Sequence, residues 1–452
     1  MCIFNLKPNE VSMKSIKIGI AGTGVVASGV VNILKRNADE ISRRAGRDIE
    51  VAVVSSRTRS KAEALVGACV EIVDDIMAVA RHPDVDIVIE TMGGYEPART
   101  FVLEAIAHGK HVVTANKALL AEHGNEIFKA AQAAGVTVAF EAAVAGGIPV
   151  IKALREGLSA NRIEWIAGII NGTTNFILTQ MREKGWTFDA ALKVAQELGY
   201  AEADPTFDVE GVDAAHKITL MSAIAFGVPI DFKAASIEGI SKLAATDIAY
   251  AEKFGYRIKL LGITKRVQNG TTDGIELRVH PTLIPESRLI ANVNGVMNAV
   301  LVKGDAVGAT LYYGAGAGAE PTGSSVVADL IDVTRTITAD PEHRVPHLAF
   351  QPDALANTPM LPLSAVQTRY YLRLTAQDRT GVLADITRIL ADHDIPVDAL
   401  PQTEVDDTTA QAHIVIMTHV SLESSVDSAV LKIKALESIT GEVVKLRVEE
   451  LG

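Results

Sequence analysis

The chain has 452 residues, which is too long for one typical domain and indicates two to four domains, of which we expect three. Its apolar share is 48% and its charged share 22%, but no uninterrupted apolar run approaches the roughly 18 residues that would span a bilayer. We therefore expect a globular protein with no membrane partner. A formal net charge of −12 with scattered basic residues argues against a nucleic-acid partner.

Cysteine content and the N-terminus bear on the cellular compartment. Cys2 and Cys69 are too few for a disulfide framework, and Met1–Ser15 lacks the basic end and apolar stretch of a signal peptide. We expect a cytoplasmic protein. Residues 1–12 precede Met13 and the first expected strand, and we assign them no function, since they could be an extension or an alternative start.

From residue 16 onward, short β-branched runs alternate with helical stretches. The expected strands are Ile16–Ala21, Ile49–Val54, Val85–Glu90, His111–Thr114 and Val136–Phe140, and the expected helices are Val25–Asn37, Lys61–Leu65 and Ala98–His108. This rhythm predicts the α/β class, with a Rossmann-type doubly wound parallel sheet.

The rest of the chain predicts two further modules. Ile163–Ile170 and Gly274–Val279 are expected strands of a second sheet, Ser324–Ile337 is an expected helix, and a Pro-rich stretch follows as a linker. The tail has a βαββαβ pattern: strand Tyr370–Leu374, helix Val382–His393, a short strand after Ile395, strand Ala410–Thr418, helix Leu422–Leu436 and strand Glu442–Val448. The expected boundaries are 1–138 with 311–345 packing back on it, 139–310, a linker at 346–367, and 368–452.

A glycine-rich turn follows the first strand. Gly22, Thr23, Gly24, Val25 and Val26 lie between that strand and an apolar helix, followed by alanine at the third glycine position. Glycines let the pyrophosphate of a dinucleotide approach the backbone at a helix N-terminus. The turn therefore predicts dinucleotide binding, and the alternative is a tight βα turn without a ligand.

The residues after the second strand bear on the choice of dinucleotide. A NAD-selective site usually has an acid there, whereas this chain has Ser55, Ser56 and Arg57. Arg57, which Arg59 could assist, suits a 2′-phosphate, so NADP is favoured over NAD. The alternative is an ordinary solvated arginine. Further loops after strands place Thr91 and Lys117 beside the cofactor.

A loop with several acids precedes a helix that carries a lysine. Asp213 and Lys217 lie four residues apart on a face that continues through Leu220 and Ile224. Burial of such a pair is costly unless the two groups meet each other or a ligand, although an ordinary i,i+4 helix pair is the alternative. A carbonyl that receives a hydride needs a proton donor, and a lysine can supply it.

These motifs together resemble the bacterial homoserine dehydrogenases that carry a C-terminal ACT domain, from about residue 16 to the end of the chain. The resemblance rests on Thr114–Leu120, Asn171–Leu178 and Leu198–Pro205, the last followed by Asp208, Asp213 and Lys217. It implies reversible NAD(P)H-dependent reduction of L-aspartate 4-semialdehyde to L-homoserine in threonine, methionine and isoleucine biosynthesis. It also implies that the middle module is an α+β substrate-binding and dimerisation domain, in a homodimer or homotetramer.

The resemblance also implies residue roles. Lys217 would be the general acid, held by Asp213; Glu202 and Asp213 would bind the substrate, with Asp208 nearby. Lys117 would help bind the cofactor and polarise the carbonyl. Gly199 and Gly316, the latter in the loop Gly314–Pro321, would close on the cofactor from the other domain. A sodium-type cation would be held by Glu141 and by the carbonyls of Val144, Gly146 and Ile148, and the alternative for this segment is a purely structural turn.

Two parts of the resemblance leave alternatives open. Many members have Gly-Leu-Gly-Thr-Val-Gly at this turn. This chain has Val25 in place of the threonine and Ala27 in place of the last glycine. Because the threonine hydroxyl is missing, phosphate binding would depend more on backbone amides. In the tail, Asp378–Leu383 is similar to the ACT turn that binds an amino acid, and the resemblance suggests L-threonine as effector. A dimerisation module without a ligand is the alternative.

Three other functions fit this sequence less well. A 2-hydroxy-acid dehydrogenase with an ACT domain normally uses a histidine–carboxylate pair with an arginine, which differs from this lysine-rich and acid-rich set. An aspartate-semialdehyde dehydrogenase needs an active-site cysteine, and neither Cys2 nor Cys69 lies in a suitable motif. A non-catalytic amino acid sensor would not need the set Glu202, Asp213, Lys217 and Lys117.

Overall fold

The computed structural model describes residues 14–268, 273–400 and 411–452. Residues 1–12, Cys2 and the first residue of the strand expected at 410–418 lie outside these ranges. The chain divides into two compact units: residues 1–151 with 317–347, and residues 152–316 with 348–452. Across the described ranges, no helix combines the length and the apolar character needed to cross a membrane.

The first unit contains a parallel sheet with the strand order β3-β2-β1-β4-β5-β6. Its strands are β1 (Ile16–Ala21), β2 (Ile49–Ser55), β3 (Glu71–Val73), β4 (Ile87–Glu90), β5 (His111–Thr114) and β6 (Val138–Ala139). The order reverses between β1 and β4, which is the point where open α/β sheets bind ligands at the carboxyl ends of their strands. The expected α/β class and doubly wound sheet are confirmed.

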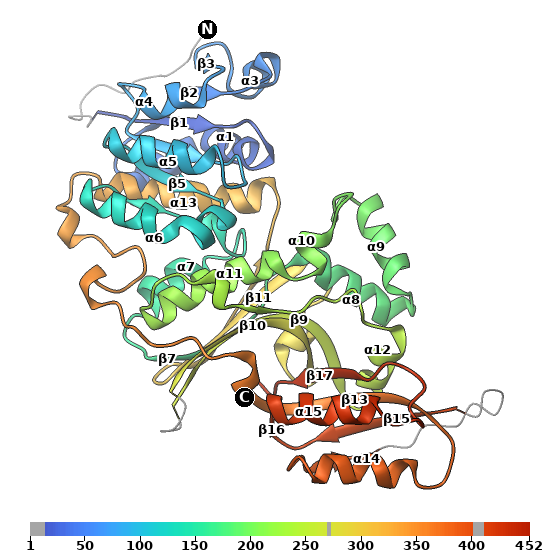
Figure 1. Ribbon diagram of the computed structural model, residues 1–452. Coiled ribbons are helices and arrows are strands. Elements are labelled where there is room, and N and C mark those ends of the chain that lie inside the picture. The colour runs from blue at the N-terminus through green and yellow to red at the C-terminus, as the bar shows by residue number, and fades with distance from the viewer. Residues whose placement is uncertain (1–13, 269–272, 401–410) are drawn as a thin grey trace. The chain divides into compact units, whose positions relative to one another are not determined.

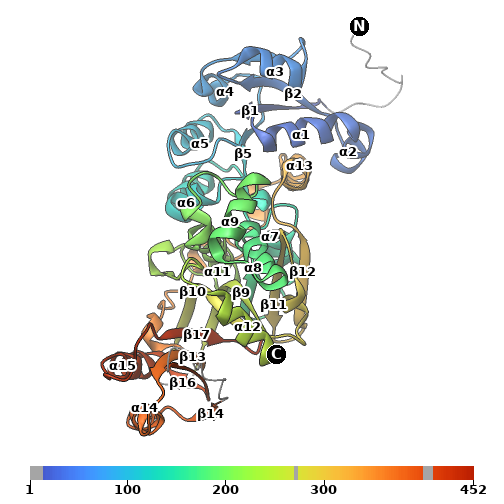
Figure 2. The same cartoon turned by 90° about the vertical axis from the view of Figure 1, so that its right-hand side faces the viewer.

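Helices cover both faces of this sheet. They are α1 (Val25–Arg36), α2 (Ala38–Ala45), α3 (Arg59–Val66), α4 (Ile76–Arg81), α5 (Ala98–Ala107), α6 (Lys117–Ala133) and α13 (Ala319–Thr336). Figure 2 shows α5 and α6 on one face of the sheet and α1 with α13 on the other. The helix α13 begins five residues before the start we expected, because Pro321 lies in its first turn, where proline is tolerated.

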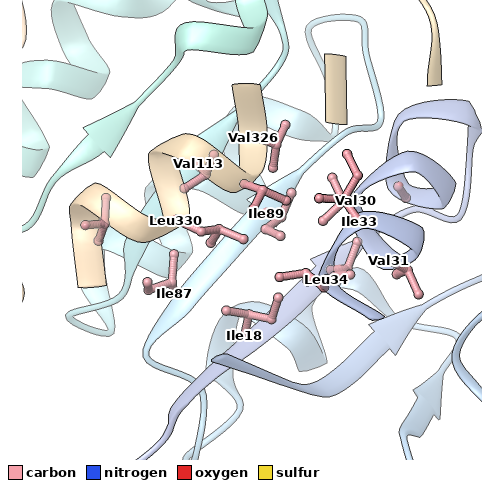
Figure 3. Packing of buried hydrophobic residues seen from close by; sticks show 14 of the residues in the cluster. Ile18, Val30, Val31, Ile33, Leu34, Ile87, Ile89, Val113, Val326 and Leu330 are labelled. Atoms are coloured by element: carbon pink, nitrogen blue, oxygen red, sulfur yellow. The ribbon is translucent and has the colours of Figure 1, made fainter. Parts of the chain in front are cut away.

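The core of the first unit joins segments that lie far apart in the chain. Val30 and Leu34 of α1 pack with Val326 and Leu330 of α13 over the central strands, as Figure 3 shows. The two helices approach closely: a Cβ on Gly29 would lie 1.8 Å from the carbonyl oxygen of Ala319.

The second unit is built on a mixed sheet with the order β12-β11-β7-β9-β10-β17-β13-β15-β14. Figure 1 labels most of its strands, among them β10, β17 and β13. Its strands are β7 (Ile163–Ile169), β8 (Ser236–Ile237), β9 (Tyr256–Val267), β10 (Gly274–Pro285), β11 (Met297–Gly304), β12 (Gly308–Ala315), β13 (Gln367–Gln377), β14 (Val397–Ala399), β15 (Gln411–Thr418), β16 (Ser421–Leu422) and β17 (Val444–Val448). Its α-helices are α8 (Gly172–Lys184), α9 (Phe188–Glu197), α10 (Thr206–Val209), α11 (Val212–Phe226), α12 (Ala245–Lys253), α14 (Val382–Ala391) and α15 (Glu423–Lys434), and α7 (Val150–Lys152) spans the boundary between the units.

The tail has the expected βαββαβ order, but its sheet continues that of the middle module. The strand β17 pairs in parallel with β10, through Thr282 with Arg447 and Leu283 with Val448. The expected linker also packs against the middle module, since the amide of Ile275 donates to the carbonyl of Pro359 and the amide of Leu361 donates back to the carbonyl of Ile275. The linker is therefore anchored to β10.

We predict that Gly29→Ala destabilises the protein. Alanine stabilises a helix interior by up to about 1 kcal/mol relative to glycine, but overpacking against a backbone carbonyl costs about 1–3 kcal/mol and outweighs that gain. Urea unfolding should show a lower midpoint than for Gly157→Ala, whose Cβ would meet no atom within 4 Å. Equal midpoints for the two variants would contradict the close α1–α13 packing.

Candidate functional site

The turn between β1 and α1 forms one wall of a cavity of about 510 Å³. Gly22 has a φ of +95°, which glycine adopts without steric cost, and its amide donates to Ser55 Oγ at 3.2 Å. Gly24 is the N-cap of α1, and a Cβ there would meet no atom within 4 Å. Since the first amides of a helix have no partner within it, this open turn fits a dinucleotide pyrophosphate. The cavity is lined by Gly22, Thr23, Gly24, Ser55, Ser56, Arg57, Thr58, Lys61, Ile76, Thr91, Met92, Gly93 and Pro97.

Two cationic side chains line this cavity. Arg57 lines it as the sequence suggests, and Lys61, in the first turn of α3, lines it as well. Arg59 instead donates from Nε to Glu63 Oε1 at 3.0 Å on the exposed face of α3. Sequence reasoning missed Lys61; the signal was its position one helical turn after Arg57.

Other predicted cofactor residues are placed differently. Of the described residues, Val25, Val26 and Lys117 do not line this cavity. Val25 is 68% exposed. Thr91 lines the cavity, with its hydroxyl donating to the carbonyl of Ala21 at 3.2 Å. Lys117 is the half-buried first residue of α6, at the carboxyl end of β5.

The second unit brings Lys217 and Asp213 together in the buried helix α11. Lys217 Nζ donates to Asp213 Oδ2 and to the carbonyl oxygen of Ile170, both at 2.7 Å. Lys217 is 8% exposed and Asp213 3% exposed. The ammonium is therefore fixed by a carboxylate and a carbonyl, and the pair is not a solvated helix pair.

A second carboxyl joins this cluster through an asparagine. Asn171 Nδ2 donates to Asp213 Oδ2 at 2.8 Å and to Asp208 Oδ1 at 2.7 Å. Burial and the neighbouring Asp213 raise the pKa of Asp208, while hydrogen bonds from Asn171 and Thr173 and the charge of Lys217 oppose that rise. From the sequence, Asn171 was recognised only as part of the motif Asn171–Leu178. Its place before α8 indicates an N-cap, and its side chain accepts a hydrogen bond from the Thr174 amide at 2.9 Å.

Three predicted residues of this unit lie outside the Lys217–Asp213–Asp208 hydrogen-bond cluster. Glu202 is exposed in the loop before α10, and its carbonyl accepts from the side chain of Gln196. Gly199 has a φ of +74° at the end of α9. At Gly316 a Cβ would lie 1.9 Å from Nδ2 of the buried Asn298, so a larger residue there would have to displace that side chain. The substrate role of Glu202 and the cofactor roles of the two glycines stay predictions.

The predicted cation segment is buried in the first unit. Glu141, 1% exposed, accepts at Oε1 from the Ile151 amide at 2.9 Å. The carbonyl of Gly146 accepts from Ser325 Oγ at 2.7 Å, and Gly146 itself has a φ of +55°. Val144 and Ile148 are also buried. One buried carboxylate with nearby carbonyls is a donor set that fits a hard cation, and in the described ranges no three His, Cys, Asp or Glu side chains gather as a metal cluster.

The glycine turn with its cavity, together with matches to known protein families and relatives, defines the class as an NAD(P)-dependent oxidoreductase that acts on CH–OH groups. A family model for homoserine dehydrogenase matches residues 149–331, the model for the NAD-binding domain of homoserine dehydrogenase matches 22–141, and the ACT domain model matches 370–438. The homoserine dehydrogenase of Pseudomonas aeruginosa is 59% identical over 97% of this chain and 100% of its own length, and that of Neisseria gonorrhoeae is 56% identical over the same shares.

Solved structures agree with this result. The crystal structure of a homoserine dehydrogenase from Thiobacillus denitrificans is 63% identical, covers 98% of this chain and 100% of its own, and has a TM-score of 0.92. That of the Staphylococcus aureus enzyme is 34% identical, covers 97% and 99%, and has a TM-score of 0.74. The chain belongs to the homoserine dehydrogenase family.

We predict that Asn171→Ala lowers kcat about tenfold, because it removes hydrogen bonds to the buried carboxyl of Asp213 and the half-buried carboxyl of Asp208. It should also lower stability by about 1 kcal/mol through loss of the α8 cap. Asn171→Ser separates the two roles, since serine can cap α8 but cannot reach both carboxyls. Steady-state rates and melting temperatures should show Asn171→Ser stable but slow. An Asn171→Ser variant with the wild-type rate would contradict the bridging role.

Proposed function

We propose that this enzyme catalyses the reversible reduction of L-aspartate 4-semialdehyde to L-homoserine, with NADPH as the preferred reductant. The supporting observation is Lys217, a buried ammonium held by Asp213 and by the carbonyl of Ile170. When bound, the nicotinamide supplies the hydride that reduces the aldehyde carbon. The carbonyl oxygen of the substrate then needs a proton, and Lys217 donates it from Nζ.

The surrounding carboxyls suit the rest of the substrate. An amino acid carries an ammonium, which carboxylates such as those of Asp208 and Asp213, with Glu202 from the loop, can bind. Asn171 holds Asp208 and Asp213 side by side and so offsets their mutual repulsion. Lys117, at the start of α6, assists cofactor binding and polarises the carbonyl. In the reverse direction neutral Lys217 takes the hydroxyl proton.

We predict that Lys217→Ala lowers kcat for NADPH oxidation with aspartate semialdehyde by 10² or more, the scale of a missing general acid. Lys242→Ala, an exposed lysine of the same unit, should keep the wild-type rate and serves as the matched control. Equal rates for Lys217→Ala and the wild type would remove the assigned mechanism.

NADP preference is proposed on Arg57 and Lys61, the two cationic side chains that line the cavity. Each of Arg57→Ala and Lys61→Ala should raise KM for NADPH about tenfold and spare KM for NADH, because only NADPH carries the 2′-phosphate. The control is Arg59→Ala, which removes an equal charge that pairs with Glu63 instead. If all three variants treat NADPH alike, the cavity residues do not select the phosphate.

A monovalent cation, in our proposal Na⁺, is held by Glu141 and by the carbonyls of Val144, Gly146 and Ile148. The support is the buried carboxylate and the tight turn at Gly146 described above. We further propose the domain boundaries given from the sequence, a homodimer or homotetramer, a cytoplasmic location and a role in threonine, methionine and isoleucine biosynthesis.

Feedback regulation by L-threonine at the ACT module is also proposed. Gly381, with a φ of +96°, caps α14 in the turn expected to bind the effector. From β17, the fully buried Arg447 donates to Glu238 through both terminal nitrogens, at 2.9 and 2.8 Å. Two residues further on, the Ile240 amide donates to the carbonyl of Val209 at 2.8 Å, next to Asp208. A continuous set of contacts thus joins the tail to the substrate cluster.

We expect added L-threonine to lower the reduction rate and to raise the melting temperature, since a ligand that binds the folded state stabilises it. Glu238→Gln should keep threonine binding, measured by the melting shift, and weaken the inhibition of rate, because it loosens the contact with Arg447. Unchanged rate and melting temperature in the wild type would reject the effector.

A further inference from the structure

Two loops beside the cofactor cavity meet on one buried carboxyl group. Glu90 is the last residue of β4 and is 0% exposed. In the sheet register it lies between Ala21 of β1 and Thr114 of β5. The other three residues of β4 are apolar and buried, so a residue that served only the sheet could be apolar as well. A carboxyl at this position is costly to bury and requires hydrogen-bond donors.

The two oxygens of Glu90 bind different loops. Oε1 accepts from the amides of Met92 at 2.7 Å and Gly93 at 3.3 Å, in the loop that lines the cofactor cavity. Oε2 accepts from Thr114 Oγ1 at 2.6 Å, and that hydroxyl in turn accepts from the amide of Asn116 at 3.0 Å. Glu90 therefore ties the loop after β4 to the loop after β5.

Asn116 closes this connection and extends it to a catalytic side chain. Its Nδ2 donates to the carbonyl of Gly94 at 2.7 Å, which returns to the first loop. Its Oδ1 accepts from the Leu119 amide at 3.1 Å and caps α6, whose first residue is Lys117. The position of Lys117 at the start of α6 thus depends on contacts that converge on Glu90.

Every one of these partners is neutral. Burial raises the pKa of Glu90, and the hydrogen bonds from Thr114, Met92 and Gly93 act in the opposite direction. These contacts neutralise no charge. Their effect is to fix the two loops relative to one another at the carboxyl edge of the sheet.

We propose that Glu90 is a positioning residue for hydride transfer, which holds the Thr91–Gly94 loop against the cofactor through one oxygen and orients Lys117 through the other. This inference rests on the proposed function in one respect, the role of Lys117. The cofactor half of it does not depend on the identity of the substrate.

The test compares Glu90→Gln, Thr114→Val and Thr114→Ser with the wild type. Glu90→Gln keeps the shape but places an amide against one loop; we expect the Kd for NADPH, from fluorescence titration, to rise about tenfold and kcat to fall about tenfold. Thr114→Val breaks only the Oε2 arm, so kcat should fall about tenfold with the NADPH Kd within twofold. Thr114→Ser restores the hydroxyl and should restore kcat.

Rates are normalised to the fraction of enzyme that binds NADPH, and Glu50→Gln, an exposed carboxylate on β2 of the same sheet, is the control. Changes confined to melting temperature or active fraction would show a purely structural role and overturn the proposal. If Glu90→Gln does not fold, the Thr114 pair decides: equal kcat for valine and serine overturns the proposal. If Lys217→Ala is harmless while Glu90→Gln still weakens NADPH binding, the proposed reaction fails and the positioning of the cofactor loop stands.

Discussion

The ammonium of Lys217 is buried, and the part of the second unit around it must stabilise that charge. An isolated charge at this depth would be very costly, and removal of one partner from a buried pair typically costs about 3–5 kcal/mol. The structure meets this demand with Asp213 one turn earlier on α11 and with the carbonyl of Ile170 at the end of β7. Asn171, the next residue, then binds Asp213 and Asp208 together. These hydrogen bonds connect the end of β7, the N-cap of α8 and helix α11.

Each unit holds part of the machinery that we propose for the reaction. The first has a glycine turn, a cavity whose lining includes Arg57 and Lys61, and the loops that Glu90 joins. The second holds Lys217, which we propose as the proton donor, and the carboxyls of Asp213 and Asp208. Because β17 continues the sheet at β10, the tail is not a loosely attached module. The buried Arg447 binds Glu238, and two residues further on the Ile240 amide donates to the carbonyl of Val209, which is the neighbour of Asp208 in α10.

Features set by local sequence were predictable. The glycine turn, the strand at Ile16–Ala21 and the i,i+4 spacing of Asp213 and Lys217 are decided within a few residues, and all three are present. Lys61 was missed because its place in the cavity lining depends on which face of α3 meets the cavity. The bridge by Asn171 was missed because its partners lie 37 and 42 residues away. The proline-rich stretch was expected as a linker from composition, but its backbone pairs with Ile275, a contact that only the folded chain reveals.

The central claim, that Lys217 Nζ is the proton donor, is tested most directly by chemical rescue. In the Lys217→Ala enzyme, small primary amines added to the assay should restore part of the NADPH-dependent reduction. The restored rate should depend on amine size, because the site is buried, and should saturate with the ammonium form of the amine. Rescue of that kind is the result the structure predicts. A rate that no amine improves, in a variant that still binds NADPH with wild-type affinity, would contradict it.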